Sequence, residues 1–362
     1  MAQREQDPRI QSLYDAGVNV YSFSKLNTID QCLYSAYRTY VKKDRGLDSV
    51  YTSLGSSIHD TLQTIIEGTG TTADLLPAMQ NTLQSLSLLD MDFPHDSKGG
   101  TSIRDNWISS MTHFCKTFTP PRGTFTAEQL LILNVPNNRA LIGYADLIQH
   151  FPDGSVRVLD WKTSSRFKPE DLQHHGRQLL VYSMALKQQG YTVHDPCWIM
   201  LKYAEVTYQD TTGTKTKSTR TYSRICERCK IAGTILLPVT KKLKESGRSQ
   251  QEIDVILQTF LGSNSLSDLP DEIASQFTIK PYVLTYQDTP EREQECLSYI
   301  DKTASLFESL NPETQSDWPS MEVDPKNAFF CNNLCGHRKT CMAVSEYNQQ
   351  YLNRTKSYDE MF

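Results

Sequence analysis

Two neighbouring runs of apolar residues constrain the fold most strongly. Residues 140–151 and 156–162 are rich in Leu, Ile and Val, and Pro-Asp-Gly-Ser joins them. This pattern predicts a β-hairpin. Asp160 and Lys162 stand two residues apart, so their side chains share one face of the second strand. Counting back from the turn places Asp146 close to opposite Asp160, allowing for a bulge.

Two converging carboxylates with an ammonium beside them are unfavourable in a protein core unless a cation also binds there. Carboxylate oxygens suit Mg²⁺ or Mn²⁺, which keep several waters and coordinate phosphates. Such an ion can polarise a phosphoryl oxygen, and Lys162 would orient water or neutralise transition-state charge. The competing interpretation is an ordinary Asp-x-Lys on an exposed strand.

The rest of the chain predicts an α/β core with a helical N-terminal wing. We expect Ser24 or Thr28 to cap the first helix, and Gly55 to open the second. The expected helices cover 30–43, 58–68, 73–87, 103–118 and 170–188 and much of 225–262 and 289–310, and the expected strands cover 128–134, 140–151, 156–162 and 198–203. The predicted divisions are a wing (1–120), a core (121–204), an insert (205–325) and a cysteine-containing tail (326–362).

Composition places limits on function and location. The net charge is −5, from 37 Lys and Arg against 42 Asp and Glu, so any DNA binding must use a local cleft. No run of eighteen apolar residues predicts a membrane span, and the charged start MAQREQDPRIQ does not resemble a secretion signal. We therefore expect a cytoplasmic protein of a bacterium, or of a phage in its host, with its nine cysteines reduced.

The hairpin belongs to a longer ordered pattern. It reads Gly-x-x-Asp, then Asp-x-Lys-Thr at the end of a strand, then Gln-x-x-x-Tyr in a helix. The pattern resembles the RecB-type branch of the PD-(D/E)xK nucleases, whose core is a mixed central sheet flanked by helices. The matching residues are Gly143, Asp146, Asp160, Lys162, Thr163, Gln178 and Tyr182.

The resemblance implies further site residues. The family places a histidine in a Leu-Gly-x-x-x-His context, which here makes His59 a metal ligand, and the backbone carbonyl of Trp161 supplies another. Gln178 and Tyr182, one helical turn apart, would contact substrate phosphate or brace Lys162. Relatives often carry an acid where Glu128 stands. A second-shell role and a plain strand-edge position both fit that residue.

Four cysteines lie towards the two ends of the chain. Cys32 is upstream, and Cys331, Cys335 and Cys341 follow one another downstream. This layout resembles the AddB helicase–nuclease subunit and the CRISPR adaptation nuclease, which hold a [4Fe–4S] cluster. Those relatives use C-x2-C-x5-C, whereas this chain has C-x3-C-x5-C. Zinc is the rival occupant, and ordinary thiols are the third interpretation.

Two weaker signals come from the insert. Lys215, Lys217 and Arg220 lie in a polar stretch that predicts either a solvated hairpin or contacts to a DNA backbone. Cys226 and Cys229 form an isolated C-x2-C, at best half of a zinc site.

By resemblance, the expected function is metal-dependent DNA cleavage, exonucleolytic on single-stranded or end-processed DNA, in repair or recombination. The alternative is a DNA-binding or nuclease subunit of a helicase, recombination or CRISPR/defence complex, inactive alone. That alternative is consistent with the lack of a G-x-x-x-x-G-K-[ST] motor motif in the chain. An unrelated enzyme with a fortuitous Asp-x-Lys is the third possibility.

Overall fold

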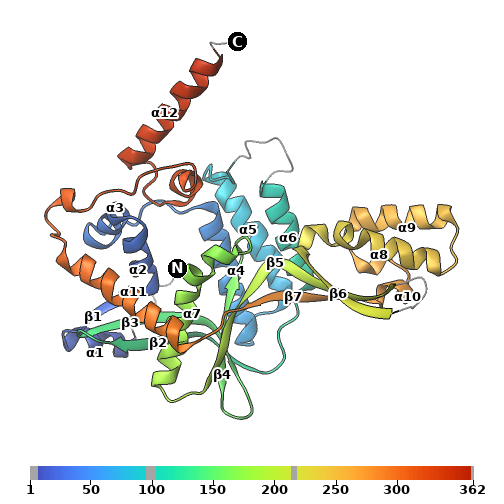
Figure 1. Cartoon of the computed structure of the whole chain (residues 1–362), viewed down its shortest axis with the longest axis horizontal. Coiled ribbons are helices and arrows are strands. Elements are labelled where there is room, and N and C mark those ends of the chain that lie inside the picture. The colour runs from blue at the N-terminus through green and yellow to red at the C-terminus, as the bar shows by residue number, and fades with distance from the viewer. Residues whose placement is uncertain (1–6, 95–102, 213–217, 360–362) are drawn as a thin grey trace.

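A mixed seven-stranded sheet organises the chain (Figure 1). The computed structural model describes residues 7–94, 103–212 and 218–359. The strands are β1 Asn19–Ser22, β2 Thr124–Val135, β3 Arg139–His150, β4 Val156–Lys162, β5 Val193–Thr212, β6 Ser218–Glu227 and β7 Phe277–Thr285. A mixed sheet flanked by helices is the fold class that the sequence predicts, and it is confirmed.

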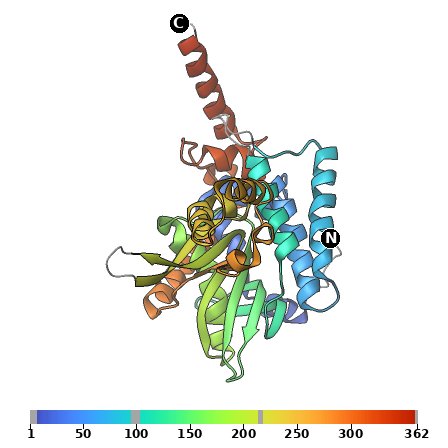
Figure 2. The same cartoon turned by 90° about the vertical axis from the view of Figure 1, so that its right-hand side faces the viewer.

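Helices cover both faces of this sheet (Figures 1 and 2). They are α1 Pro8–Asp15, α2 Phe23–Gln31, α3 Leu33–Ala36, α4 Val50–Ile66, α5 Leu75–Leu88, α6 Ile103–Thr117, α7 Leu172–Gln188, α8 Ile231–Glu245, α9 Gln250–Ser263, α10 Asp271–Ala274, α11 Pro290–Ser309 and α12 Met342–Asp359. One apolar cluster joins α4, α5 and α6 to the sheet, and a second joins α2, α7 and α11 to it. No helix in the described ranges is both long and apolar enough to cross a membrane.

Strand β3 has two partners on one of its edges. Along the other edge it pairs with β2 over nearly its whole length. On the shared edge, β1 runs parallel to residues 139–142, and β4 runs antiparallel to residues 147–150. Residues 143–146 therefore lie where β1 has ended and β4 has diverged. We call this gap the fork.

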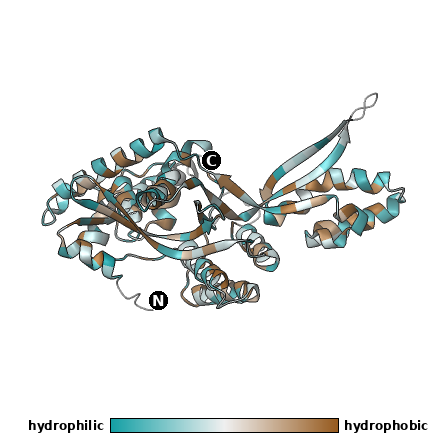
Figure 3. Cartoon of the chain, turned by 90° about the horizontal axis from the view of Figure 1, so that it is seen from below, coloured by the Kyte–Doolittle hydropathy of each residue, from teal (hydrophilic) through white to brown (hydrophobic). Residues whose placement is uncertain are grey.

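Strand β5 connects the core to a projecting arm. Its first half pairs with β4, and its second half pairs with β6 on the same edge, while β7 covers the opposite edge. The arm consists of the outer part of this sheet with α8, α9 and α10, and it has an apolar cluster of its own around Val206, Ile235 and Phe260. Figure 3 shows the arm extending away from the core.

The first helices differ from those predicted. Where one helix is expected over 30–43, α2 begins at Phe23, with Ser22 as its cap, and ends at Gln31 because Cys32 is extended, with φ −161°. The chain resumes as α3 and then a π-helical turn, Tyr37–Val41. The second helix begins at Val50 with Ser49 as its cap, so Gly55 lies inside the helix instead of opening it.

Two features of the insert were not predicted. Strand β5 runs twenty residues, Val193–Thr212, far beyond the apolar strand expected over 198–203, and β7 was not foreseen at all. Both strands alternate polar and apolar residues in the arm, since only one of their faces packs on helices. Lys280 and Pro281 interrupt the β-forming pattern of β7.

Candidate active site

The fork brings the two predicted carboxylates together. The β3–β4 ladder ends at the pair Leu147 and Leu159, and one residue further the same register sets Asp146 opposite Asp160 without a bulge. Here the strands separate, and the Asp146 carboxylate replaces the ladder: its Oδ2 accepts a hydrogen bond of 2.9 Å from the amide of Trp161. The side chain of Asp146 therefore fixes where β4 lies as it leaves β3.

Helix α4 supplies the histidine. A Cβ added to Gly55 would lie 3.4 Å from Oγ1 of Thr163, so the glycine lets the helix approach the residue after Lys162 closely. One turn further along α4, Nδ1 of His59 lies 3.3 Å from Oδ2 of Asp146. The Leu-Gly-x-x-x-His pattern thus places Gly55 against the strand end and His59 at the carboxylates.

Lys162 lies against Asp160. Its Nζ is 2.6 Å from Oδ2 of Asp160, a carboxylate that is only 2% exposed. That oxygen has no well-directed hydrogen bond among the described residues, so the ion pair is its main stabilising contact. A buried carboxylate oxygen with one ammonium partner can still accept a cation.

Burial and charge compete within this cluster. Burial, partly opposed by the charge of Lys162, raises the pKa of Asp160 to about 6. For Asp146, burial acts upward, but the hydrogen bond and charge of His59 outweigh it and lower the pKa of the carboxyl. Burial likewise opposes protonation of His59, yet Asp146 and Asp160 leave its pKa raised. The Asp160 carboxylate overcomes burial at Lys162 and raises the pKa of that ammonium.

Tyr182 and Gln178 lie one turn apart on α7, as the sequence indicates. Nε2 of Gln178 donates to the hydroxyl of Tyr182 at 3.3 Å, and the tyrosine is buried. A Cβ on Gly143 would lie 2.7 Å from Cε1 and 2.9 Å from the hydroxyl of Tyr182. The glycine of Gly-x-x-Asp therefore leaves space for the tyrosine of Gln-x-x-x-Tyr.

Glu128 and His175 also lie at the site. Glu128 falls opposite the Asp146 position in the β2–β3 register, and its backbone has the unusual φ of +49°. Its negative charge contributes to raising the pKa of Tyr182. His175, which looked unremarkable in sequence, stacks on Phe167 at 4.0 Å between ring centroids. Burial, then the charges of His174 and Lys162, lower the pKa of His175 to about 4, so this imidazole is neutral.

The types of ligand atom at the fork are those that a hard divalent cation binds. Two carboxylates converge with an imidazole, and the buried oxygen of Asp160 has only an ammonium against it. In the described ranges, no three His, Cys, Asp or Glu side chains form a ready-made metal-holding group. Because Nζ of Lys162 lies against Oδ2 of Asp160, we expect a cation bound at that oxygen to displace the ammonium, and the Trp161 carbonyl remains an expected ligand.

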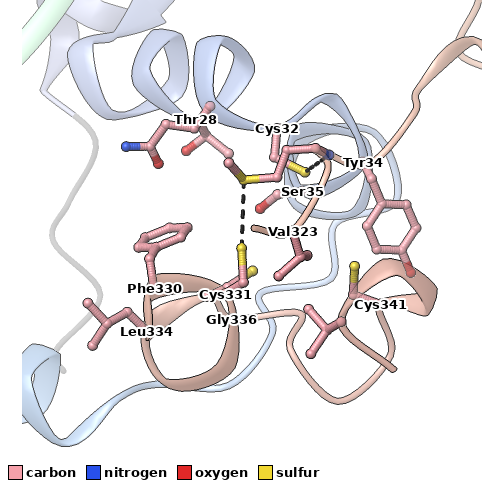
Figure 4. Close-up of a pocket in the computed structure, with 14 residues that line it drawn as sticks. Thr28, Cys32, Tyr34, Ser35, Val323, Phe330, Cys331, Leu334, Gly336 and Cys341 are labelled. Atoms are coloured by element: carbon pink, nitrogen blue, oxygen red, sulfur yellow. Dashed lines mark hydrogen bonds between the residues drawn. The ribbon is translucent and has the colours of Figure 1, made fainter. Parts of the chain in front are cut away.

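The four predicted cluster cysteines line one cavity of about 180 Å³ (Figure 4). Cys32 lies at the break between α2 and α3, where its Sγ accepts from the amide of Met321 at 3.4 Å. Sγ of Cys331 lies 3.8 Å from the sulfur of the same methionine. Cys335 and Cys341 complete the wall of the cavity.

The cysteine-containing tail is also fastened to the wing by hydrogen bonds. The amide of Leu47 donates to the carbonyl of Gly336 at 2.8 Å, and Arg338 donates to the carbonyl of Asp48 at 2.9 Å. Nε2 of the buried His337 lies 3.0 Å from the hydroxyl of Thr39. The tail thus closes on the wing, as the fold prediction states.

The remaining predicted residues lie apart from the fork. Arg220 is exposed on β6, opposite Asp210, and Lys215 and Lys217 fall outside the described residues. Cys226 is buried in the arm and Cys229 is half-buried in the turn after β6, so Cys226 packs as an apolar residue.

Comparison with protein families agrees with this geometry. The sequence model of the PD-(D/E)XK nuclease superfamily matches residues 20–342, which make up most of the chain. The chain belongs to this superfamily, a class that hydrolyses phosphodiester bonds with metal ions, usually Mg²⁺ or Mn²⁺. No curated protein matches the sequence.

Replacing Gly143 with alanine tests the packing of the site. The added methyl would collide with Tyr182, so Gly143→Ala should lower the free energy of unfolding by about 1–3 kcal/mol in urea titrations. Gly262→Ala is the matched control, because a Cβ there meets nothing within 4 Å and Gly262 lies in α9. Equal stability of Gly143→Ala and wild type would show that the ring does not need this space.

Metal binding should depend on pH through Asp160. Its pKa of about 6 means that protons compete with the cation in mildly acidic solution, and the raised pKa of His59 acts in the same direction. Calorimetric titration with Mn²⁺ should show affinity falling below pH 6 by up to about tenfold per pH unit through Asp160 alone, and more steeply where His59 is also protonated. Asp160→Asn should bind weakly at every pH. Wild-type affinity that is constant between about pH 5 and pH 7 would contradict this electrostatic account.

Proposed function

We propose that this protein is a Mg²⁺- or Mn²⁺-dependent deoxyribonuclease that acts as an exonuclease on single-stranded or end-processed DNA. One observation carries the proposal: the fork gathers Asp146, Asp160 and Lys162 within a chain of the PD-(D/E)XK superfamily. By the same family resemblance, the proposed setting is DNA repair or recombination in the cytoplasm of a bacterium or phage-infected cell.

Each residue of the site has a role in this proposal. Asp146, Asp160, His59 and the Trp161 carbonyl hold the cation, which when bound supplies Lewis acidity at a phosphoryl oxygen. In the free site the carboxylate neighbours of Lys162 raise its pKa, and the protonated lysine would neutralise charge on the phosphate as the transition state forms. Gln178 contacts the substrate phosphate, and Tyr182 fixes the orientation of the Gln178 side chain through their hydrogen bond.

The arm is the expected guide for the DNA strand. The β4–β5 register pairs Lys162 with Met200, and the arm begins only a few residues further along β5. A strand of DNA that leaves the site along β5 would therefore contact the arm within a few nucleotides. Arg220, with Lys215 and Lys217 next to it in sequence, is the proposed phosphate contact near its tip.

The second candidate is a subunit that needs a partner. Its support is two exposed apolar side chains on the arm, Leu237 of α8 (81% exposed) and Val255 of α9 (60% exposed). A helicase, recombination or CRISPR/defence protein covering this surface would then bring the DNA to the fork. An intact protein without nuclease activity on its own is what this candidate predicts.

We further infer that Cys32, Cys331, Cys335 and Cys341 hold a [4Fe–4S] cluster. The support is that all four surround one cavity, and that burial, then the charges of the other three, raise the pKa of Cys331 to about 11. Mutual repulsion of thiolates is what a bound cationic centre would relieve. Zinc is the alternative occupant of the same four sulfurs.

Cleavage of end-labelled DNA tests the nuclease. Wild type with Mg²⁺ or Mn²⁺ should release label from 5′- or 3′-labelled single-stranded DNA, and the labelled end that is lost first gives the polarity. Lys162→Ala and Asp160→Ala should each reduce the rate by about a hundredfold or more, since they remove transition-state charge stabilisation. Lys244→Ala, an exposed change on α8, is the control. Wild-type rates in the Lys162 or Asp160 variants would refute the site assignment.

Iron analysis tests the cluster. Protein purified without oxygen should contain iron and acid-labile sulfide, and Cys341→Ser should lose most of both. Cys197→Ser is a suitable control because Cys197 is buried in the apolar cluster beside α6. Zinc in place of iron would identify the rival metal, and the absence of both would leave the four cysteines as plain thiols.

A further inference from the structure

A further cavity, lined by both polar and apolar side chains, lies where the arm meets the core, distinct from the fork. It measures about 390 Å³, and its walls come from α6 and the loop after it, from the turn after β6, and from β7. The polar side chains that line it are His113, Thr117, Thr119, Arg228, Ser265, Ser267 and Lys280. None of the described residues that line this cavity carries a carboxylate.

Arg228 is the central residue of this cavity. It is only 5% exposed, and its Nε donates to the carbonyl of Leu201 at 2.9 Å. Its Nη1 is 3.4 Å from Oγ1 of Thr117, and the guanidinium lies 5.5 Å from the ring centroid of Phe114. These contacts fix the guanidinium at the cavity wall, and none of them brings a negative charge.

The charge of Arg228 is paired with no carboxylate of the described residues. In the described ranges no carboxylate lies within 4.0 Å of its nitrogens, and the adjacent Glu227 pairs with Lys202 and Lys230 instead. Burial of this uncompensated cation lowers its pKa to about 10. Such an arrangement is costly unless an anion completes it.

The position of Arg228 follows from a break in the sheet. In the β5–β7 ladder, Met200 pairs with Tyr282 and Ala204 pairs with Pro281. Because Pro281 and Tyr282 are consecutive, the three residues of β5 between these pairs, Leu201, Lys202 and Tyr203, have no partners in β7. Arg228 donates to the Leu201 carbonyl within this break. Lys280 lies one residue before Pro281, where the shift occurs, and is the cross-strand partner of Glu205 in β5. Its exposed side chain adds a second cation at the mouth of the cavity.

We propose that this cavity binds a phosphate group between Arg228 and Lys280. The hydroxyls of Thr117, Thr119, Ser265 and Ser267 provide further donors, and a guanidinium is the side chain best suited to phosphate. The phosphate comes either from the backbone of a DNA strand or from a free mononucleotide or phosphate ion. In both cases the joint between core and arm becomes a ligand site, separate from catalysis.

Thermal melting tests the site without any cleavage. With EDTA present and ionic strength held constant by NaCl, inorganic phosphate should raise the melting temperature of the wild type in a saturable way. Arg228→Gln, which keeps an amide N–H for Leu201, and Lys280→Ala should each weaken phosphate binding by about tenfold. Lys244→Ala should respond like the wild type.

Unfolding in the absence of phosphate separates a ligand role from a structural one. A buried cation without a counter-ion destabilises the free protein, so Arg228→Gln should melt at a similar or higher temperature than wild type. A large loss of stability in Arg228→Gln, with the phosphate response retained in Lys280→Ala, would overturn the proposal. An equal rise of melting temperature with phosphate in all variants, or no rise in the wild type, would also overturn the proposal.

Competition identifies the source of the phosphate. Binding of a short single-stranded oligonucleotide, measured in the Lys162→Ala background, should weaken in Lys280→Ala and be displaced by phosphate if DNA occupies the cavity. If thymidine monophosphate displaces phosphate while DNA affinity is unchanged by Lys280→Ala, the ligand is a free nucleotide. Either result supports a phosphate site and stands whether or not the chain cleaves DNA.

Discussion

Two carboxylates held together at a gap in the sheet are the constraint on which the rest of the site depends. Asp146 accepts from the amide of Trp161 and meets His59, while Asp160 is buried against Lys162. Like charges in such a place need cations around them. The histidine and the lysine supply that positive charge, and Gly143 allows Tyr182 of α7 to pack beside them.

The same sheet joins catalysis to the arm. Strand β5 pairs with β4 at Lys162 and continues into the arm, so the two parts share one continuous strand. At the junction the ladder to β7 breaks, and the buried Arg228 occupies the break. An anion bound there would bring together the turn after β6, β7 and α6, and so change how firmly the arm is fixed to the core.

Much of the site could be predicted from the sequence, because strand alternation and turn length are local properties. The facing of Asp146 and Asp160 follows from counting along the hairpin, and the spacing of Gln178 and Tyr182 follows from helical periodicity. The packing of Gly143 on Tyr182 could not be derived this way, because it joins segments far apart in the chain.

Other features depended on tertiary contacts that local patterns do not contain. The fork exists because β1 pairs with β3, a contact between residues 19–22 and 139–142. The helix break at Cys32 coincides with a contact to Met321, and β7 is a strand through pairing with β5. The buried charge of Arg228 gave no signal in sequence, since a single arginine after a strand is common.

The most direct test of the central claim is a crystal structure of the protein soaked with Mn²⁺, with the ion located by its anomalous scattering. The account predicts a Mn²⁺ ion in the fork, bonded to carboxylate oxygens of Asp146 and Asp160 at about 2.0–2.3 Å, with Lys162 moved away from Asp160. An empty fork at saturating Mn²⁺, with Lys162 still paired to Asp160, would contradict it.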